Sequence, residues 1–514
     1  MAATAPTDPF ERLTACFSGR ARLAHAQTYL SWDQMVMMPP GGNEARSATL
    51  AELATLSHRA LIADEVGEWL EAAGQELAGA DPDSPHTRLQ RARLVEMGRE
   101  RREAVALPGD LVRARVVAGS RCEAGWRVQR PANDWTGFLE NFAPVVALSR
   151  EAAEAYREAG GHASRYEAMM ALYCTGDDPA RTATLFGELE RALPPLLQEV
   201  VEHQAGSPVP RLDGPFPVAG QVALGRRLAA RLGFDFERGR LDTSLHPFST
   251  GSRGDLRITT RYREQDCFDA LQATAHEIGH ASYEGGLPEA FADEPVGQSR
   301  SMSVHESQSL FFEKHLFLSR AFLQAFAPDV RAALPGLAGT DAHTLWRSQL
   351  GVGPSLVRVE ADEVTYPLHV LLRHGIERAL IDGELEAQDV PGAWDERMQA
   401  LLGLDTRGNH TDGCLQDIHW SDGSFGYFPS YTLGAINAAS IAAAIDRDLP
   451  GWRDGVATGR DGAIEPLREW LGARVWSRAS TVDASTLMSG ATGGVPGTQA
   501  LLSHLRRRYL DEAV

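Results

Sequence analysis

The sequence predicts a mainly α-helical protein with a small β-sheet near the middle of the chain. From about residue 10 to residue 235, apolar residues recur at helical spacing, with Glu and Arg between them. Only residues 240–263 are typical of strands, because residues 256–262 are rich in β-branched side chains and follow a Gly/Ser turn. Helical spacing resumes at Phe268 and continues, with loops, toward the C-terminus.

Within the first half, the clearest helical segments share one apolar face and one face rich in Glu and Arg. They are residues 44–56, 84–106, 135–158 and 179–203. Pro144 and the pair Pro194-Pro195 are expected to kink or split the last two of these helices. No linker and no repeat of fixed period is present, so we predict one domain over residues 1–514. Its helical half extends to about residue 235, and the half that holds the sheet covers about 236–514.

The charge and cysteine content exclude several classes of protein. The 514 residues include 50 Lys and Arg against 69 Asp and Glu, a formal net charge of −19. This excess repels phosphate backbones and anionic lipid, so we expect no nucleic acid and no membrane partner. The five cysteines are scattered and form no C-x-x-C pair, which argues against a disulfide framework or a cysteine-built zinc site. The N-terminal segment has no signal-peptide pattern, and we expect a cytoplasmic protein.

A metal-binding motif lies at His276-Glu277-Ile278-Gly279-His280, an H-E-x-x-H sequence. An apolar stripe through Phe268, Leu271, Ala275 and Ile278 predicts that this segment is an amphipathic helix. Residues four apart face the same way on a helix, so both imidazoles can bind one metal ion. Glu277 is placed to reach a metal-bound water and act as general base. The alternative is a solvated helix on which these three residues coincide by chance.

A catalytic zinc site needs a third protein ligand and an open position for water. The extended motif that ends in a third histidine fails, because Tyr283 and Gly286 occupy its required Gly and His positions. A glutamate on a following helix is the other solution, and we predict Glu306, which lies 26 residues after His280. Its neighbour His305 is expected to support a ligand rather than bind the metal, because adjacent helical residues diverge. The nearer acidic competitors lie in or beside a Gly/Pro-containing connection and are Glu284, Glu289 and Glu294.

Several motifs in one order make the whole chain resemble the Taq-type metallocarboxypeptidases. This gluzincin family is related in fold to angiotensin-converting enzyme and to neurolysin-like oligopeptidases. The resemblance rests on the HEIGH motif and on motifs near both ends of the chain. They are Leu30-Ser31-Trp32-Asp33-Gln34, Met37-Met38-Pro39-Pro40-Gly41-Gly42, His246-Pro247-Phe248, Asp255-Leu256-Arg257-Ile258-Thr259, His305-Glu306-Ser307-Gln308-Ser309, Val357-Arg358-Val359-Glu360-Ala361-Asp362 and Gly413-Cys414-Leu415-Gln416-Asp417-Ile418-His419-Trp420. The resemblance implies a large helical body with a deep central groove.

The resemblance also implies an activity: removal of single residues from the free C-terminus of peptides, with broad specificity and poor action at proline. Such an enzyme needs a cation for the α-carboxylate, and arginine can pair with a carboxylate in bidentate fashion. Arg358 is our first choice and Arg257 the second, although Arg257 could equally be a structural partner of Asp255. The family further suggests a homodimer.

Other site residues follow from the same resemblance. His419 and Tyr427 resemble the His and Tyr with which related gluzincins stabilise the oxyanion, and Tyr431 is the runner-up to Tyr427. A packed aromatic at a loop–helix junction is the alternative for Tyr427. Gln416 and Asp417 are expected to orient neighbours or substrate. His246 is expected to line the groove.

The predicted cofactor is one Zn²⁺ per chain, because two imidazoles and a carboxylate suit zinc; Co²⁺ or Mn²⁺ could substitute. The predicted function is therefore zinc-dependent hydrolysis of the C-terminal peptide bond. Two alternatives stay open. One is an endo-acting oligopeptidase with the same metal centre, and the other is a helical interaction protein that keeps a structural metal site.

Overall fold

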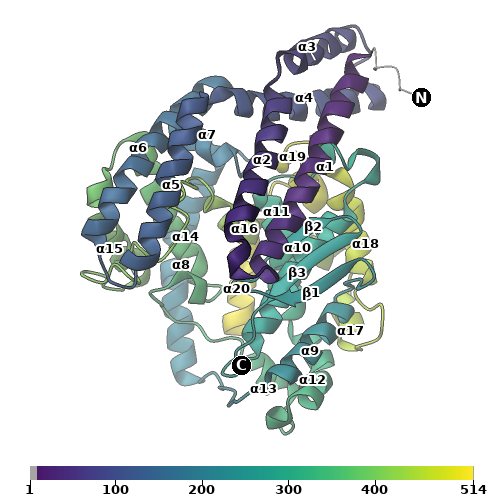
Figure 1. Cartoon of the computed structure of the whole chain (residues 1–514). Helices are drawn as coiled ribbons and strands as arrows, with labels where there is room; N and C mark the ends of the chain where they lie inside the picture. Colours follow the sequence, from purple (N-terminus) through teal and green to yellow (C-terminus); the bar gives the residue numbers. More distant parts are fainter. Residues whose placement is uncertain (1–7, 513–514) are drawn as a thin grey trace.

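A computed structural model describes residues 8–512 of the chain (Figure 1). Part of the N-terminal segment that lacks a signal-peptide pattern, residues 1–7, lies outside the described residues. The mainly helical prediction with a small mid-chain sheet is confirmed. None of the helices within residues 8–512 combines the length and apolar content needed to cross a membrane.

Between residue 8 and the sheet, all the regular elements are helices. They are α1 (Pro9–Val36), α2 (Asn43–Ile62), α3 (Asp64–Ala78), α4 (Pro85–Ala106), α5 (Gly109–Gln129), α6 (Trp135–Gly160), α7 (Arg165–Ala171), α8 (Pro179–Gly206) and α9 (Val218–Arg231), with a short turn η1 (Pro40–Gly42). Polar side chains start several of them: Asp8 caps α1 and Asp178 caps α8.

The prolines inside two of these helices do not divide them. Pro144 lies within α6, and Pro194-Pro195 lie within α8, yet both helices are continuous. The alternative in which these prolines split the helices is therefore wrong. Each proline removes one backbone hydrogen bond. Buried side chains directly follow the prolines, among them Val145 and Leu196. Their packing stabilises the helix where the backbone hydrogen bond is missing.

The sheet has three strands in the order β1-β3-β2: β1 (Gly239–Thr243), β2 (Ser249–Ser252) and β3 (Asp255–Thr260). β1 runs parallel to β3 with Leu241 opposite Ile258, and β2 runs antiparallel to β3 as an edge strand. The central strand packs against the next helix, because Thr260 is fully buried and its hydroxyl donates to the Ala270 carbonyl.

The rest of the chain is again helical, with short 3₁₀ turns between the longer elements. The longer elements are α10 (Phe268–Gly286), α11 (Met302–Leu310), η4 (Phe311–Phe317), α12 (Arg320–Ala333), α13 (Ala342–Arg347), α14 (Tyr366–Asp382), α15 (Val390–Leu402), α16 (Pro429–Asp448), α17 (Trp452–Ala457), α18 (Glu465–Arg474), α19 (Ala484–Thr492), α20 (Thr498–Arg506) and η9 (Arg507–Asp511). The 3₁₀ turns are η2 (Glu289–Phe291), η3 (Pro295–Gly297), η5 (Pro335–Leu337), η6 (Arg358–Glu360), η7 (Ala387–Asp389) and η8 (Trp476–Arg478). The elements η4 and η9 are short π-helices.

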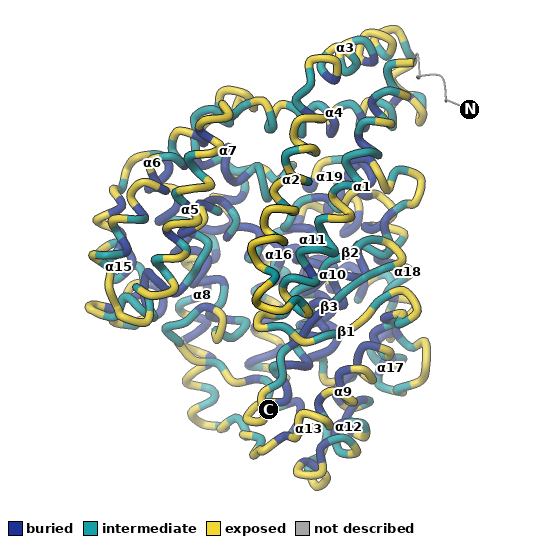
Figure 2. Tube along the Cα trace, in the orientation of Figure 1, coloured by how far each residue is buried: buried dark blue, intermediate teal, exposed yellow. Residues whose placement is uncertain are grey.

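Two hydrophobic cores lie in the described residues. The large one extends from Cys122 to Tyr509, and α10, α11 and α16 contribute to it. Figure 2 shows these helices mostly buried, whereas α1 and α2 carry exposed faces. The small core joins α1 to α4 and includes Leu13 and Met97.

Buried ion pairs connect the first four helices to the segment that follows α10. The Arg93 guanidinium pairs with the Glu294 carboxylate at 2.6 Å, and Arg300 pairs with Glu96 at 2.7 Å. A cavity of about 560 Å³ separates α1 from β2 and from this segment, and Glu284 lines it.

Candidate metal centre

The helix α10 presents both histidines of the H-E-x-x-H motif on one side. Its apolar face, which includes Leu271, Ala275 and Ile278, is completely or almost completely buried in the large core. That burial fixes the rotation of the helix about its axis. The His276 and His280 rings therefore lie one turn apart, with their centroids 4.9 Å from each other.

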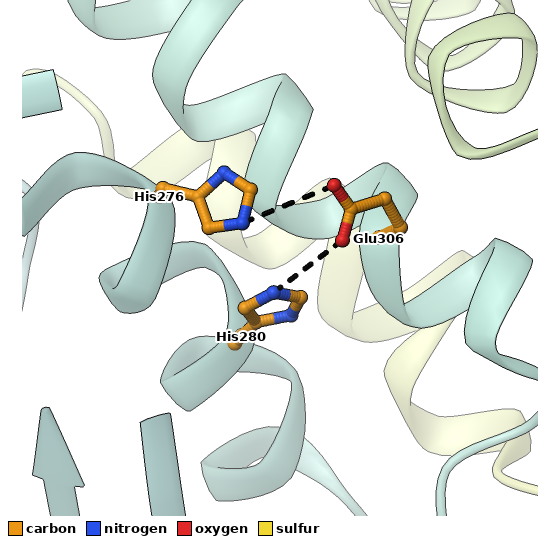
Figure 3. Close-up of side chains that lie close together, drawn as sticks. All are labelled: His276, His280 and Glu306. Atoms are coloured by element: carbon orange, nitrogen blue, oxygen red, sulfur yellow. Dashed lines mark ion pairs between the residues drawn. The ribbon is translucent and has the colours of Figure 1, made fainter. Parts of the chain in front are cut away.

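Glu306 reaches these two histidines from the neighbouring helix α11. Its Oε1 lies 3.9 Å from His276 Nε2, and its Oε2 lies 3.6 Å from His280 Nε2 (Figure 3). Figure 3 shows the two rings and the carboxylate pointing toward one another. The ligand atoms of all three residues lie within 4.8 Å of one another. Donor atoms around a tetrahedral Zn²⁺ are separated by about 3.4 Å, so this arrangement fits a divalent ion.

The acidic competitors for the third position have other partners or lie apart. The Glu284 carboxylate accepts from Ser299 and contacts His305. Glu294 pairs with Arg93 in a buried site, and Glu289 is exposed on η2. Of these acids, only Glu306 shares a cluster with both motif histidines.

A second layer of side chains holds each histidine by its other ring nitrogen. Glu313 Oε2 lies 2.8 Å from His276 Nδ1, and His305 Nδ1 lies 2.6 Å from His280 Nδ1. These contacts leave both Nε2 atoms directed toward Glu306. His305 thus touches a motif histidine and Glu284 rather than joining the three-residue cluster. We did not predict Glu313; its place on η4, seven residues after Glu306, gives no signal in the sequence.

Three buried carboxylates surround the histidines, and burial together with the neighbouring charges sets their pKa values. Burial raises the pKa of Glu277 to about 7, and the Glu306 carboxylate adds to this rise. Burial also raises the pKa of Glu306. Although burial acts in the same direction on Glu313, the Lys314 ammonium and the His276 ring lower its pKa to about 2. A cation bound between these groups would relieve the repulsion.

The pKa of His276 also indicates that the carboxylates favour a positive charge beside them. Burial acts to lower its pKa, but the carboxylates of Glu306 and Glu313 raise it to about 9. In the absence of a metal ion, a proton on His276 therefore supplies the positive charge that the carboxylates require.

Two glycines allow the helices that carry these ligands to approach closely. A Cβ on Gly279, inside the motif, would lie 2.5 Å from the Gln308 carbonyl oxygen on α11. A Cβ on Gly434, on α16, would lie 2.6 Å from Glu306 Cγ. Any side chain at either position would therefore displace the helix that carries Glu306.

Arg358 lies in η6 with its guanidinium largely engaged. Its Nη2 donates to Asp417 Oδ1 at 2.8 Å, its Nε donates to the same oxygen at 3.1 Å, and its Nη1 donates to the Tyr366 hydroxyl at 2.6 Å. The second oxygen of Asp417 accepts from Arg373, which is fully buried. Gln416 accepts from the Arg358 backbone N–H, so it orients this segment.

Arg257 has a different environment on β3. It pairs with Asp255 through two hydrogen bonds of 2.8 and 3.0 Å, the structural partnership left open above. Its guanidinium carbon lies 4.3 Å from the Tyr29 ring centroid and 4.2 Å from that of Trp32. His246 is exposed in the connection between β1 and β2, and no contact within residues 8–512 joins it to the three-residue cluster.

His419, Tyr427 and Tyr431 form an aromatic group, and the Glu306 charge acts on the two tyrosines. The His419 and Tyr427 ring centroids are 5.7 Å apart, and those of Tyr427 and Tyr431 are 5.4 Å apart. Burial raises the pKa of Tyr427, and the Glu306 charge raises it further. Burial lowers the pKa of His419 to about 4, and its buried Nδ1 has no hydrogen-bond partner. These groups are therefore neutral near pH 7, and each carries a proton that it can donate.

Comparison with known proteins agrees with this site. The family model described as "Carboxypeptidase Taq (M32) metallopeptidase" matches residues 12–509. The thermostable carboxypeptidase 1 of Thermus thermophilus is 36% identical over 508 residues, which cover 97% of each chain. The solved structure of Trypanosoma cruzi metallocarboxypeptidase 1 is 37% identical, has a TM-score of 0.93, and is matched over 98% of this chain and 99% of that one. An M32 carboxypeptidase from Deinococcus radiodurans has a TM-score of 0.90 at 32% identity, with the same coverage. The resemblance inferred from the motifs is confirmed.

We predict that Glu313→Gln weakens metal binding about 10- to 100-fold, because it removes the negative charge that orients His276 and makes it a better donor. Competition with a chromogenic chelator measures the affinity. The matched control is Glu386→Gln, a side chain that is 61% exposed on the surface. Equal affinity in the variant and in the unmodified protein would contradict the role given to Glu313.

We also predict that Gly279→Ala forces α10 and α11 apart. It should lower the free energy of unfolding by about 1–3 kcal/mol and weaken metal binding in the same assay. Gly74→Ala in α3 is the control, because nothing lies within 4 Å of the added Cβ. That control should be neutral or stabilising by up to about 1 kcal/mol. Similar results for the two variants in denaturant unfolding would show that the close approach at Gly279 has no effect.

Proposed function

The chain belongs to the carboxypeptidase Taq (M32) family of metallopeptidases and is a metal-dependent carboxypeptidase; from this premise we propose how its residues perform the reaction. The metal is zinc, one ion per chain, held by His276, His280 and Glu306, with Co²⁺ or Mn²⁺ as possible substitutes. The observation that carries the proposal is the convergence of these three side chains, with the Glu277 carboxyl buried beside them.

Glu277 is the general base and later the general acid. Zinc, when bound, lowers the pKa of a water molecule and polarises the scissile carbonyl. The Glu277 carboxylate accepts the proton of the attacking water and delivers it to the leaving amine. A pKa raised by burial makes this carboxylate a stronger base than an exposed one, so both transfers can occur near pH 7.

His419 and Tyr427 stabilise the oxyanion of the tetrahedral intermediate by donating hydrogen bonds. Their support is that both rings are neutral and half-buried, that their centroids are 5.7 Å apart, and that the Glu306 charge acts on Tyr427. Tyr431 contacts the Tyr427 ring and is the alternative donor. Donors held in place by packing of this kind are worth about 3–4 kcal/mol of transition-state stabilisation.

Arg358 binds the α-carboxylate of the peptide. Three of its five N–H groups serve Asp417 and Tyr366, and one N–H on each terminal nitrogen is left for a bidentate contact. Asp417 balances only one of the two arginines that it contacts, so Arg358 and Arg373 together keep one positive charge. Fixing the C-terminus in this way would place only the last peptide bond at the metal.

Four further residues have smaller proposed roles. Asp417 and Gln416 position Arg358, Arg257 holds Asp255 on the central strand β3 beside α1, and His246 lines the substrate groove. We propose that residues 1–514 act as one domain, with broad specificity, poor action at proline, a homodimeric state and a cytoplasmic location. The peptide partners are those with a free C-terminus.

A peptide ladder tests the reaction type. Mass analysis should show successive loss of C-terminal residues, and a chelator should abolish that loss. The same peptide with an amidated C-terminus should resist cleavage by at least about 100-fold, because Arg358 loses its charged partner. Internal cleavage of the amidated peptide would instead favour the endo-acting oligopeptidase.

The pH profile and Glu277→Gln test the general base. Activity should rise with pH as Glu277 deprotonates, with an acid limb at or below pH 7, because a bound cation favours the carboxylate. Glu277→Gln should lower kcat by at least about 10³-fold while metal content and the unfolding midpoint stay unchanged. If the Glu277→Gln variant kept its activity, Glu277 would not be the general base. If the chain were a helical interaction protein with a structural metal site, the unmodified protein would show no hydrolysis.

A further inference from the structure

A second cavity, separate from the catalytic cluster, is lined by more cationic than acidic side chains. Its volume is about 340 Å³, and it lies between η4, the start of α12, α17 and the C-terminal η9. In Figure 1, α12 and α17 lie in the lower part of the molecule, where the C-terminus is also marked. Five cations line it: Lys314, Arg320, Arg453, Arg507 and Arg508. Only two acidic residues line it, Asp454 and Glu512.

We propose that this cavity, which we call the basic pocket, binds a phosphate group, either as free inorganic phosphate or as part of a larger phosphorylated molecule. Cations gathered around one cavity repel one another, and a bound anion would relieve that repulsion. Tetrahedral dianions with several acceptor oxygens suit a pocket built mainly from arginine.

The strongest observation is an arginine that is buried at the pocket without enough partners. Arg508 is 4% exposed, and its Nη1 donates to the Lys314 carbonyl at 3.0 Å. Its Nε lies 3.5 Å from Glu363 Oε2, and neither Nε nor Nη2 makes a hydrogen bond within the described part of the chain. A buried guanidinium with unsatisfied donors is expensive. These two nitrogens have almost no accessible surface, so a phosphate in the pocket would balance the charge of Arg508 rather than accept hydrogen bonds from them.

Other features of the wall also favour an anion. Ser319, Arg320 and Ala321 form the N-terminal end of α12 and line the pocket, so the positive end of the helix dipole faces it. Within residues 8–512, Arg320 has a ring contact with Trp346 and no carboxylate partner. Burial lowers the pKa of His315 at the pocket wall, and the positive charge of Arg508 lowers it further.

A metal ion is the alternative occupant of this region, because His315, Glu363 and His504 form a second cluster of possible ligands. The distances argue against it. His504 Nε2 lies 2.8 Å from Glu363 Oε1, a hydrogen-bond distance, whereas the catalytic histidines lie 3.6 and 3.9 Å from Glu306. The second oxygen of Glu363 accepts from the Tyr509 hydroxyl, so its carboxylate is already satisfied. Nearby Arg508 would also repel a cation.

The basic pocket is connected to the catalytic cluster through three consecutive residues of η4. Lys314, the only lysine of the chain, lines the pocket, and its ammonium donates to Glu313 at 2.6 Å. Glu313 in turn contacts His276, while His315 faces the pocket again. An anion in the pocket can therefore change the electrostatic environment of His276, which is proposed to bind the catalytic metal.

Calorimetric titration of the zinc-loaded full chain with inorganic phosphate tests the proposal, at constant ionic strength set with sodium chloride. We expect saturable binding of one phosphate per chain. The double variant Arg320→Gln/Arg507→Gln should weaken it at least tenfold, because it removes two cations that contact the dianion. Both side chains are exposed, so the variant should fold normally.

The matched control removes two exposed arginines elsewhere, in Arg238→Gln/Arg407→Gln, and should bind phosphate within twofold of the unmodified protein. A parallel titration with a nucleoside diphosphate separates the sources: tighter binding than free phosphate, again lost in the pocket variant, indicates a larger ligand. Non-saturable binding would overturn the proposal. Phosphate binding that the pocket variant leaves unchanged would also overturn it, because the phosphate would then lie at the catalytic metal. A second bound zinc ion that is lost in His504→Gln would overturn it too, because a metal would then occupy this region.

Discussion

The burial of three carboxylates around two imidazoles is the constraint on which the rest of the site depends. Glu277, Glu306 and Glu313 are each less than 9% exposed, and burying such charges is costly unless positive charge lies among them. The chain supplies part of that charge with His276 and Lys314. A divalent ion supplies the remainder, so the arrangement that makes the apo site unfavourable is also what makes it bind metal. Stability and metal affinity are therefore two measures of the same repulsion.

Close helix packing turns this electrostatic demand into a defined geometry. Ligands on two different helices can meet at one ion only if the distance between the helix axes is fixed to within a fraction of an ångström. Gly279 lets α10 lie against the α11 backbone, and Gly434 lets α16 lie against Glu306 itself. The carboxylate is thus held between a helix that carries the histidines and a helix that continues from the Tyr427 segment. Movement of any one helix would change the ligands and the oxyanion donors together.

Sequence alone predicted the parts of the site that depend on local spacing. His276, Glu277 and His280 lie within one turn of an amphipathic helix, and the mainly helical fold follows from the same periodicity. Glu306 needed a choice among nearby acids, because its contact with α10 crosses between helices. Glu313 and Arg373 were missed, since each meets its partner only through tertiary packing. The suggestion that internal prolines split α6 or α8 was wrong for the same reason: packing outweighs the one hydrogen bond lost in α6 and the two lost in α8.

Lys314 shows how a charge outside the catalytic cluster can act on it. Its ammonium lowers the pKa of Glu313 and so keeps a negative charge beside His276 Nδ1. The same ammonium also draws electron density from that carboxylate, which makes Glu313 a weaker acceptor for His276. A phosphate group in the basic pocket would offset part of the Lys314 charge and strengthen the Glu313–His276 contact, making His276 a better metal ligand. Thermodynamic linkage then requires the reverse effect as well: zinc in the catalytic cluster must tighten the binding of phosphate by the same factor.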